Sequence, residues 1–179
     1  MNPTPVPNTD RAQLCVRSIH LMATSEPAEF AEVIHPRAVN REAIAEPPAA
    51  RGVGPLAYRA TALWLQEAFD DLAWDVHDVV EHGDLVVVHV TMRGIQTGTF
   101  VSYGPDARPV AAFPARGRRF AITQTHWLRT ADGKVIEHWA NRDDLGMAQQ
   151  LGWTPPSPGY LLSMWWALRR ARAAHDRQG

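Results

Sequence analysis

The sequence predicts an α+β domain in which N-terminal helices cover a strongly curved antiparallel sheet. Apolar residues recur every three or four positions up to about residue 69, every second position from Leu72 to about Asp143, and at helical spacing again near the C-terminus. Helices that precede and follow a block of strands, instead of alternating with them, are typical of α+β architectures. A curved sheet closed by helices forms a cone, and such a cone encloses a pocket.

Start signals place the helices. A first helix follows Thr9 or Asp10, either of which can cap it, and a short second helix is expected over residues 24–34. A third helix begins near residue 54 and has the most regular apolar stripe of the N-terminal half. Residues 36–53 are expected to be irregular, and a long irregular segment in a compact domain is either floppy or functional.

Strands are expected where the apolar period is two and β-branched residues are common. Gly83 and Gly133 lie in hairpin-type turns, so the strands before and after each of them are expected to pair. The expected strands, in chain order, are 72–80, 84–94, 99–103, 110–113, 119–128 and 134–143.

The length of 179 residues suits one domain with a sizeable core and is short for two. We expect a flexible proline-rich arm over residues 1–8, a single domain over residues 9–153 and a helical extension over residues 154–179. Ser157 and Pro158 are typical of the first positions of a helix in that extension. Its apolar face is expected to pack on the domain or on a second copy of the chain, in preference to a membrane surface.

Composition and charge disfavour several kinds of partner. The formal net charge is -1 and the sequence pI is near 6.7, so no excess of positive charge favours nucleic acid. The single cysteine, Cys15, cannot form an internal disulfide, which is consistent with a reducing cytoplasm. The N-terminal residues lack the features of a signal peptide, and no apolar run reaches the roughly 20 residues of a membrane-spanning helix. We therefore expect a cytoplasmic protein that binds neither nucleic acid nor membrane.

The last expected strand, 134–143, has an unusually polar face. Alternation puts Glu137, Trp139, Asn141 and Asp143 on the face that begins at Val135, and it puts Ile136, His138, Ala140 and Arg142 on the other. Amide and carboxylate groups cost free energy to bury unless they are paired. The Trp139 face therefore predicts the polar wall of a pocket.

Between about Glu29 and Gly152 the sequence resembles the SnoaL-like polyketide cyclases of the nuclear-transport-factor-2-like superfamily. The resemblance is carried by AFDDL (68–72), HGDLVVVHVTMRG (82–94), TGTF (97–100) and above all DGKVIEHWANRDDLG (132–146) followed by QLG (150–152). It implies the cone-shaped fold of that superfamily, no metal or organic cofactor, and one pocket carboxylate that serves as acid and base in the intramolecular aldol closure of a polyketide methyl ester. It places that carboxylate at Asp143.

The chemistry sets requirements on the site. A carboxylate that takes a proton from carbon needs a pKa raised toward the working pH, which burial among apolar walls provides. Neutral donors must hold the enolate oxygen, and His126, Asn141 and Gln96 are the candidates. Asp143 could instead cap the helix that begins at Asp144, or the two carboxylates could divide the roles.

The predicted catalytic residues are therefore Asp143 and His126. The predicted ligand contacts are Trp139, Asn141, Gln96, His89 and Trp64, although Trp64 also fits the core stripe of its helix. Gln96 stands where relatives commonly have a histidine, which leaves the reaction open. The ligand is expected to be a hydrophobic small molecule, and the exposed sheet face of this fold favours a homodimer.

Two function classes follow from these observations. One is a cofactor-independent enzyme, of the cyclase or isomerase kind, and the other is a non-catalytic binding module, because one fold serves many functions. A metal site is disfavoured because His77, His82 and His89 do not share strand parity and no cysteine or HExxH-type motif accompanies them.

Overall fold

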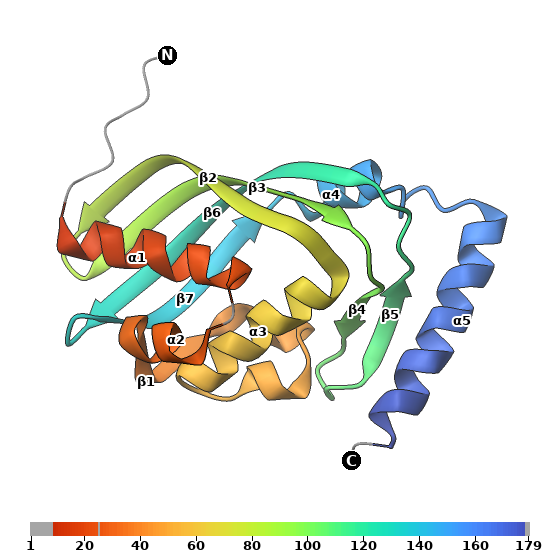
Figure 1. Ribbon diagram of the computed structural model, residues 1–179, viewed down its shortest axis with the longest axis horizontal. Helices are drawn as coiled ribbons and strands as arrows, with labels where there is room; N and C mark the ends of the chain where they lie inside the picture. Colours follow the sequence, from red (N-terminus) through yellow and green to blue (C-terminus); the bar gives the residue numbers. More distant parts are fainter. Residues whose placement is uncertain (1–8, 25, 178–179) are drawn as a thin grey trace.

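The computed structural model describes residues 9–24 and 26–177. The predicted arm, residues 1–8, lies outside the described residues. Figure 1 shows the N-terminal helices lying across one side of a curved sheet, with the C-terminal helix at the far end of the molecule. The helices are α1 (Asp10–His20), α2 (Pro27–Val33), α3 (Pro55–Ala68), α4 (Asp144–Leu151) and α5 (Pro158–His175).

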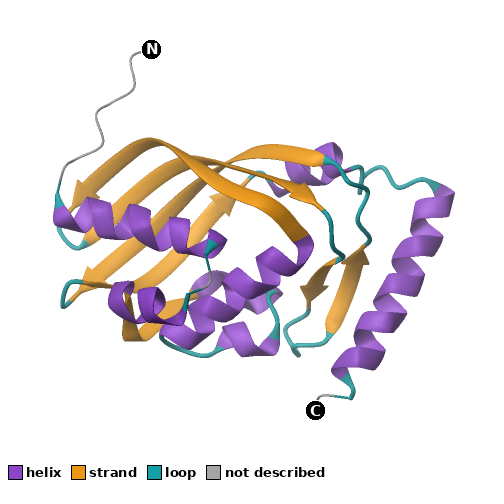
Figure 2. Ribbon diagram, in the orientation of Figure 1, coloured by secondary structure: helices purple, strands orange, loops and turns teal. Residues whose placement is uncertain are grey.

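The main sheet has five strands in the order β1-β7-β6-β3-β2, and a separate hairpin is formed by β4 and β5 (Figure 2). The strands are β1 (Ile34–Asn40), β2 (Phe69–His82), β3 (Leu85–Gln96), β4 (Phe100–Tyr103), β5 (Pro109–Phe113), β6 (Arg119–Ala131) and β7 (Lys134–Arg142). The predicted α+β class, with N-terminal helices over a curved sheet and a C-terminal helix, is confirmed.

The segment expected to be irregular contains a strand. Residues 36–53 begin inside β1, which pairs parallel with β7 at the edge of an otherwise antiparallel sheet. Pro36 hides this strand in the sequence, since proline lacks an N–H and is tolerated only at edges and irregular positions of a sheet. Two 3-10 helices follow, η2 (Arg41–Ala45) and η3 (Pro48–Arg51). The segment is therefore ordered, and it lies against the concave side of the sheet.

A bulge in β7 changes which side chains face the core. Arg129 of β6 pairs with Glu137, but the next residue, Thr130, pairs with Val135, so Ile136 is an extra residue in β7. A bulge of this kind places two residues opposite one and interrupts the alternation of faces. Val135 is fully buried in the core, and beyond the bulge the even-numbered residues face the same side.

Two predicted helix caps are present. The Thr9 hydroxyl accepts a hydrogen bond from the Ala12 N–H at 3.1 Å, and the Ser157 hydroxyl accepts one from Tyr160 at 3.3 Å. Helix α5 then packs on β5, where the Tyr160 hydroxyl donates to the Pro114 carbonyl at 3.0 Å. These contacts attach the C-terminal helix to the β4-β5 hairpin.

Gly98 allows the chain after β3 to pass the end of α3. Its N–H donates to the Ala68 carbonyl at 3.0 Å, and a Cβ at this position would lie 1.9 Å from the Glu67 carbonyl oxygen. We expect Gly98→Ala to lower the free energy of unfolding by about 1–3 kcal/mol, because the backbone must move to accept the methyl group. Urea denaturation at pH 7.5 measures this change.

Gly159→Ala is the matched control for that substitution. A Cβ at Gly159 meets no atom within 4 Å, and the residue lies in the first turn of α5. This variant should unfold at the wild-type urea concentration or a slightly higher one. A Gly98→Ala protein as stable as Gly159→Ala would contradict the steric argument.

Candidate active site

A cavity of about 250 Å³ lies between the concave face of the sheet and the segments that cover it. One part of its wall is aromatic. Trp153 stacks on Phe113 and Phe100, with ring centroids 4.4 Å and 5.4 Å apart, and Trp64 lies 4.8 Å from Phe100. Flat, weakly polar rings of this kind suit the faces of a planar hydrophobic ligand.

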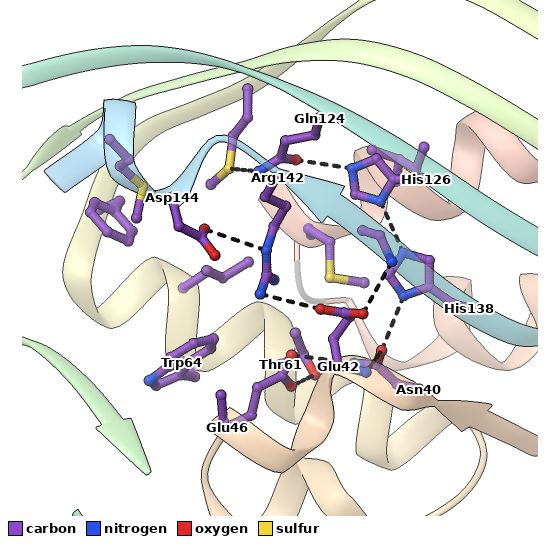
Figure 3. A pocket seen from close by; sticks show the side chains of 18 of the residues that line it. Asn40, Glu42, Glu46, Thr61, Trp64, Gln124, His126, His138, Arg142 and Asp144 are labelled. Atoms are coloured by element: carbon purple, nitrogen blue, oxygen red, sulfur yellow. Dashed lines mark hydrogen bonds and ion pairs between the residues drawn. The ribbon is translucent and has the colours of Figure 1, made fainter. Parts of the chain in front are cut away.

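The opposite part of the wall is a chain of hydrogen-bonded polar side chains, shown in Figure 3. Nδ1 of His138 lies 3.1 Å from Asn40 Oδ1, and its Nε2 lies 2.9 Å from Nδ1 of His126. Nε2 of His126 lies 2.9 Å from Oε1 of Gln124. The Trp74 indole also donates to Gln124 Oε1, at 3.3 Å. These residues come from β1, β2, β6 and β7, so the row of hydrogen bonds involves four of the five strands of the main sheet.

Both imidazoles are held toward their neutral form. Burial lowers the pKa of His138 from 6.5 to about 4, and the positive charge of Arg142 acts in the same direction. Burial also lowers the pKa of His126 well below its usual value, with further contributions from His138 and Arg142. A neutral imidazole has one donor and one acceptor nitrogen, so each ring can link two neighbours.

Glu46 extends this row of hydrogen-bonded side chains. It lies in residues 36–53, the segment that covers the cavity and is called the covering segment below. Its carboxylate accepts hydrogen bonds from the Thr61 hydroxyl and, at 3.3 Å, from the Asn40 amide. Burial raises the pKa of Glu46, which is 3% exposed, while the Thr61 bond, the charge of Arg142 and the Asn40 bond act against that increase. Both carboxylate oxygens already have partners, so Glu46 helps to hold the wall together.

A charged triplet lies beside this chain. Nη2 of Arg142 lies 3.3 Å from Glu42 Oε2, and its Nε lies 3.6 Å from Asp144 Oδ1. The Glu42 carboxylate also accepts from the Ala140 N–H at 3.2 Å, which fixes it against β7. Arg142 and Asp144 both line the cavity, and the Asp144 side chain is 65% exposed, so this carboxylate is open to solvent and to a ligand.

The structure places Asp143 outside the cavity lining. Its carboxylate accepts from the Gly146 N–H at 2.8 Å and caps α4, the alternative that the sequence left open. The prediction that its face of β7 forms the pocket wall was wrong, because the bulge at Ile136 turns that face outward. Its catalytic role stays a prediction, and the neighbouring Asp144 is the carboxylate that lines the cavity.

Three predicted ligand contacts lie on the outer face of the sheet. Trp139 stacks on Trp127 with ring centroids 6.0 Å apart, and Asn141 accepts from the Trp127 indole at 3.3 Å. His89 pairs with the Thr125 hydroxyl at 3.2 Å. None of these three predicted contacts is among the cavity-lining residues, so their expected placement was wrong.

Of the three remaining predicted site residues, two line the cavity and one does not. His126 and Trp64 line the cavity, as expected, and the Trp64 indole donates to the Val101 carbonyl at 2.9 Å. Gln96 is fully buried behind the aromatic wall and does not line the cavity. Its amide accepts from the Trp153 indole at 3.1 Å and donates to the Phe113 carbonyl at 2.8 Å. Gln96 therefore positions two rings of the wall.

Several cavity residues were not predicted. Asn40, Glu42 and Glu46 lie in the segment that the sequence marked only as floppy or functional, while His138 and Arg142 lie on the strand face assigned to the outside. The usable signal was the density of polar residues in a segment with two adjacent prolines, Pro47 and Pro48. Nothing local in the sequence shows that this segment reaches the cavity.

Comparison with known proteins decides the family. The family model described as SnoaL-like polyketide cyclase matches residues 13–151. The chain belongs to the SnoaL-like polyketide cyclase family. The resemblance drawn from the Asp132–Gly152 motif is thereby confirmed.

Among curated relatives, aklanonic acid methyl ester cyclase DnrD from Streptomyces peucetius is 32% identical over 143 residues, which cover 79% of this chain and 90% of DnrD. DauD from Streptomyces sp. (strain C5), also an aklanonic acid methyl ester cyclase, is 31% identical over 85% of this chain and 86% of its own length.

Solved structures support the fold. TsrD from Streptomyces laurentii is 25% identical with a TM-score of 0.65, and the match covers 81% of this chain and 96% of TsrD. A SnoaL-like polyketide cyclase from Agrobacterium tumefaciens is 13% identical with a TM-score of 0.58 and shares the fold over 81% of this chain and 99% of its own.

Within residues 9–24 and 26–177, no group of three or more histidine, cysteine, aspartate or glutamate side chains is arranged to hold a metal ion. Within the same residues, no helix has the length and apolar character needed to cross a membrane. The homodimer and the cytoplasmic location stay predictions.

The lowered pKa of the half-buried His138 predicts how stability depends on pH. Its pKa of about 4 in the folded protein, against 6.5 for a free imidazole, means that the unfolded chain takes up a proton first as the pH falls. Between pH 7 and 4 this favours unfolding by at most about 3 kcal/mol. Glu46 contributes with the opposite sign, because its raised pKa makes the folded protein bind a proton first.

We therefore compare wild type with His138→Gln, which removes one titrating group and keeps the Glu46 contribution. Urea denaturation at pH 7.5, 6 and 5 should show that the free-energy advantage of wild type over the variant shrinks as the pH falls. His77→Gln, on the outer face of the same sheet, is the control and should follow wild type. A constant difference between wild type and His138→Gln would show that His138 is not held neutral.

Proposed function

We propose that the protein is a cofactor-independent cyclase that closes a ring in a hydrophobic, ester-bearing polyketide by an intramolecular aldol reaction. The observation that carries the proposal is the pairing of Asp144 with Arg142, 3.6 Å apart, on the wall of a largely aromatic cavity. Family membership and the methyl ester cyclases among the relatives support the substrate class.

In this reaction the Asp144 carboxylate takes a proton from the carbon next to a carbonyl group of the ligand. The resulting enolate carbon attacks a ketone carbon of the same molecule, and a carbon–carbon bond forms. The Asp144 carboxyl then returns its proton to the alkoxide oxygen, so the ligand is isomerised with no gain or loss of atoms. Proton transfer by a positioned side chain of this kind contributes about 10²–10⁴-fold to a rate.

Arg142 is suited to stabilise the charge that develops on oxygen. Its guanidinium is always protonated, and contacts to Glu42 and Asp144 on two sides hold it at the cavity wall. A fixed positive charge near a developing enolate oxygen lowers the barrier without reorganisation of the site. The rings of Phe113, Phe100 and Trp153 would meanwhile hold the planar part of the ligand.

Other carboxylates are less suited to this role. Both oxygens of Glu46 are hydrogen-bonded to Thr61 and Asn40, and the Asp143 carboxylate caps α4. His126 lines the cavity, yet burial lowers the pKa of its imidazole, which makes it a weak base toward a C–H proton. Asp144 is therefore the group we assign as acid and base.

The test compares Asp144→Asn with Asp143→Asn on two substrates: aklanonic acid methyl ester, which the names of DnrD and DauD contain, and nogalonic acid methyl ester, which the name of a third relative, a cyclase from Streptomyces nogalater, contains. We expect Asp144→Asn to lower kcat by about 100-fold or more. Asp143→Asn should stay within about twofold of wild type, because asparagine caps a helix as well as aspartate does. Cyclised product is measured by liquid chromatography with mass detection.

Three other results would contradict the role assigned to Asp144. A large loss in Asp143→Asn with an active Asp144→Asn would transfer the acid and base role to Asp143. Full activity in both variants would exclude a carboxylate mechanism at this end of β7. Tight binding of both esters with no turnover by wild type would identify a binding module in place of an enzyme.

A further inference from the structure

The polar chain in the cavity wall ends on two hydrogen-bond acceptors. Oδ1 of Asn40 accepts from the backbone N–H of Glu42 at 3.1 Å, and Oε1 of Gln124 accepts from the Trp74 indole N–H at 3.3 Å. A backbone N–H and an indole N–H can only donate, so they fix the orientation of both amides. The oxygen of each amide, and not its nitrogen, therefore faces the histidines.

Between these two oxygens lie two imidazole rings and three contacts. The distances are 3.1 Å from Asn40 to His138, 2.9 Å from His138 to His126, and 2.9 Å from His126 to Gln124. Each contact needs one hydrogen, which makes three. Two neutral imidazoles have one N–H each, which makes two. In the neutral pair, one of the three contacts must join two lone pairs.

Rotation of an amide does not remove this deficit. With Gln124 turned over, its NH₂ group would face His126 correctly but would also face the Trp74 N–H, donor against donor. With Asn40 turned over, its NH₂ group would face the Glu42 N–H in the same way. The missing hydrogen moves along the chain, and the number of unmade contacts stays at one.

A third proton on the pair would complete the chain at the cost of a buried positive charge. Arg142 on β7 opposes that charge, and burial lowers the pKa of both rings. Glu42 and Glu46, from the covering segment, favour it, and Tyr58 of α3 faces His138 with ring centroids 6.5 Å apart. The directions of the two pKa shifts show that burial and Arg142 prevail, so the neutral pair is one hydrogen short.

We propose that the missing hydrogen is supplied by a hydroxyl group of the bound ligand, an enol or a phenol, which donates to the pair formed by His126 and His138. Both rings line the cavity, and the contact that has no hydrogen leaves one ring nitrogen without a bond to hold it, so that nitrogen can turn to such a hydroxyl. If the proton is transferred completely, the O–H bond breaks and an N–H bond forms. The ligand is then an enolate or phenolate beside a histidine pair with one positive charge.

This inference names the group that the cavity recognises, and it does not depend on ring closure. It rests on the hydrogen count of the chain, whereas the proposed cyclase activity rests on Asp144. A protein with no cyclase activity can still prefer a ligand with a hydroxyl group, and an active cyclase can lack that preference. Turnover of the methyl esters tests the cyclase activity, and the binding of simple probes tests the recognition of a hydroxyl group.

The test uses two flat probes that differ in one hydrogen-bond donor, 2-naphthol and 2-methoxynaphthalene. We expect wild type to bind 2-naphthol at least about tenfold more tightly, because only the hydroxyl satisfies the unmade contact. Dissociation constants are measured by calorimetric titration at pH 7.5. Equal affinities for the two probes would overturn the proposal.

His126→Gln tests the hydrogen count directly. A glutamine amide brings two N–H hydrogens where the neutral imidazole brings one, so the variant pair has three hydrogens for three contacts. The preference for 2-naphthol should fall to within about twofold. His77→Gln, whose ring contacts the Thr91 hydroxyl on the outer face of the sheet, should keep the tenfold preference. A His126→Gln protein that keeps it as well would overturn the proposal.

A measurement on wild type alone covers the case in which His126→Gln does not fold. In protein labelled with ¹⁵N in its histidines, NMR reports which ring nitrogens carry hydrogen. Saturation with 2-naphthol should shift the ring nitrogens of the histidine pair, and saturation with 2-methoxynaphthalene should leave them in place. Identical spectra with the two probes would contradict the inference.

Discussion

The arrangement of the site depends on keeping a row of polar side chains hydrogen-bonded on the wall of a largely apolar cavity. The row runs from Thr61 on α3 through Glu46, Asn40, His138 and His126 to Gln124 on β6. An unpaired polar group in such a place costs on the order of 1–3 kcal/mol. The row joins α3, residues 40–46, β7 and β6, so the requirement fixes residues 40–46 against the sheet.

The bulge at Ile136 makes that row possible. Without the extra residue, β7 would keep its Val135 parity, and Trp139 and Asn141 would face the cavity in place of His138 and Arg142. A bulge is a change of one residue in pairing with a large effect on which side chains meet. The same event turns Trp139 toward Trp127 on the outer face and leaves Asp143 free to cap α4.

The aromatic part of the cavity depends on Gln96 in a comparable way. A buried amide offers one acceptor and two donors, and here the acceptor binds the Trp153 indole while the NH₂ group binds the carbonyls of Gly98 and Phe113. An imidazole has only two nitrogens and could not make all three bonds. Gln96 thus has a structural role behind the wall, and it leaves the polar part of the cavity to supply the chemistry.

The sequence by itself determined the family and the class of fold. The change of apolar period from 3.6 to 2 at Leu72 and the motif ending in Gln150-Leu151-Gly152 are local features, and local features survive without knowledge of the rest of the chain. The caps at Thr9 and Ser157 were predictable for the same reason. His126 and Trp64, two of the predicted site residues, line the cavity, and their roles stay predictions.

Only the tertiary structure decided which polar residues meet. Asn40, Glu42 and Glu46 approach His138 and Arg142 across about a hundred residues of sequence, through the parallel pairing of β1 with β7. No periodicity encodes such a contact, because it is set by how separate elements pack. The face of β7 was likewise decided by the bulge, since strand parity read from sequence assumes an uninterrupted ladder.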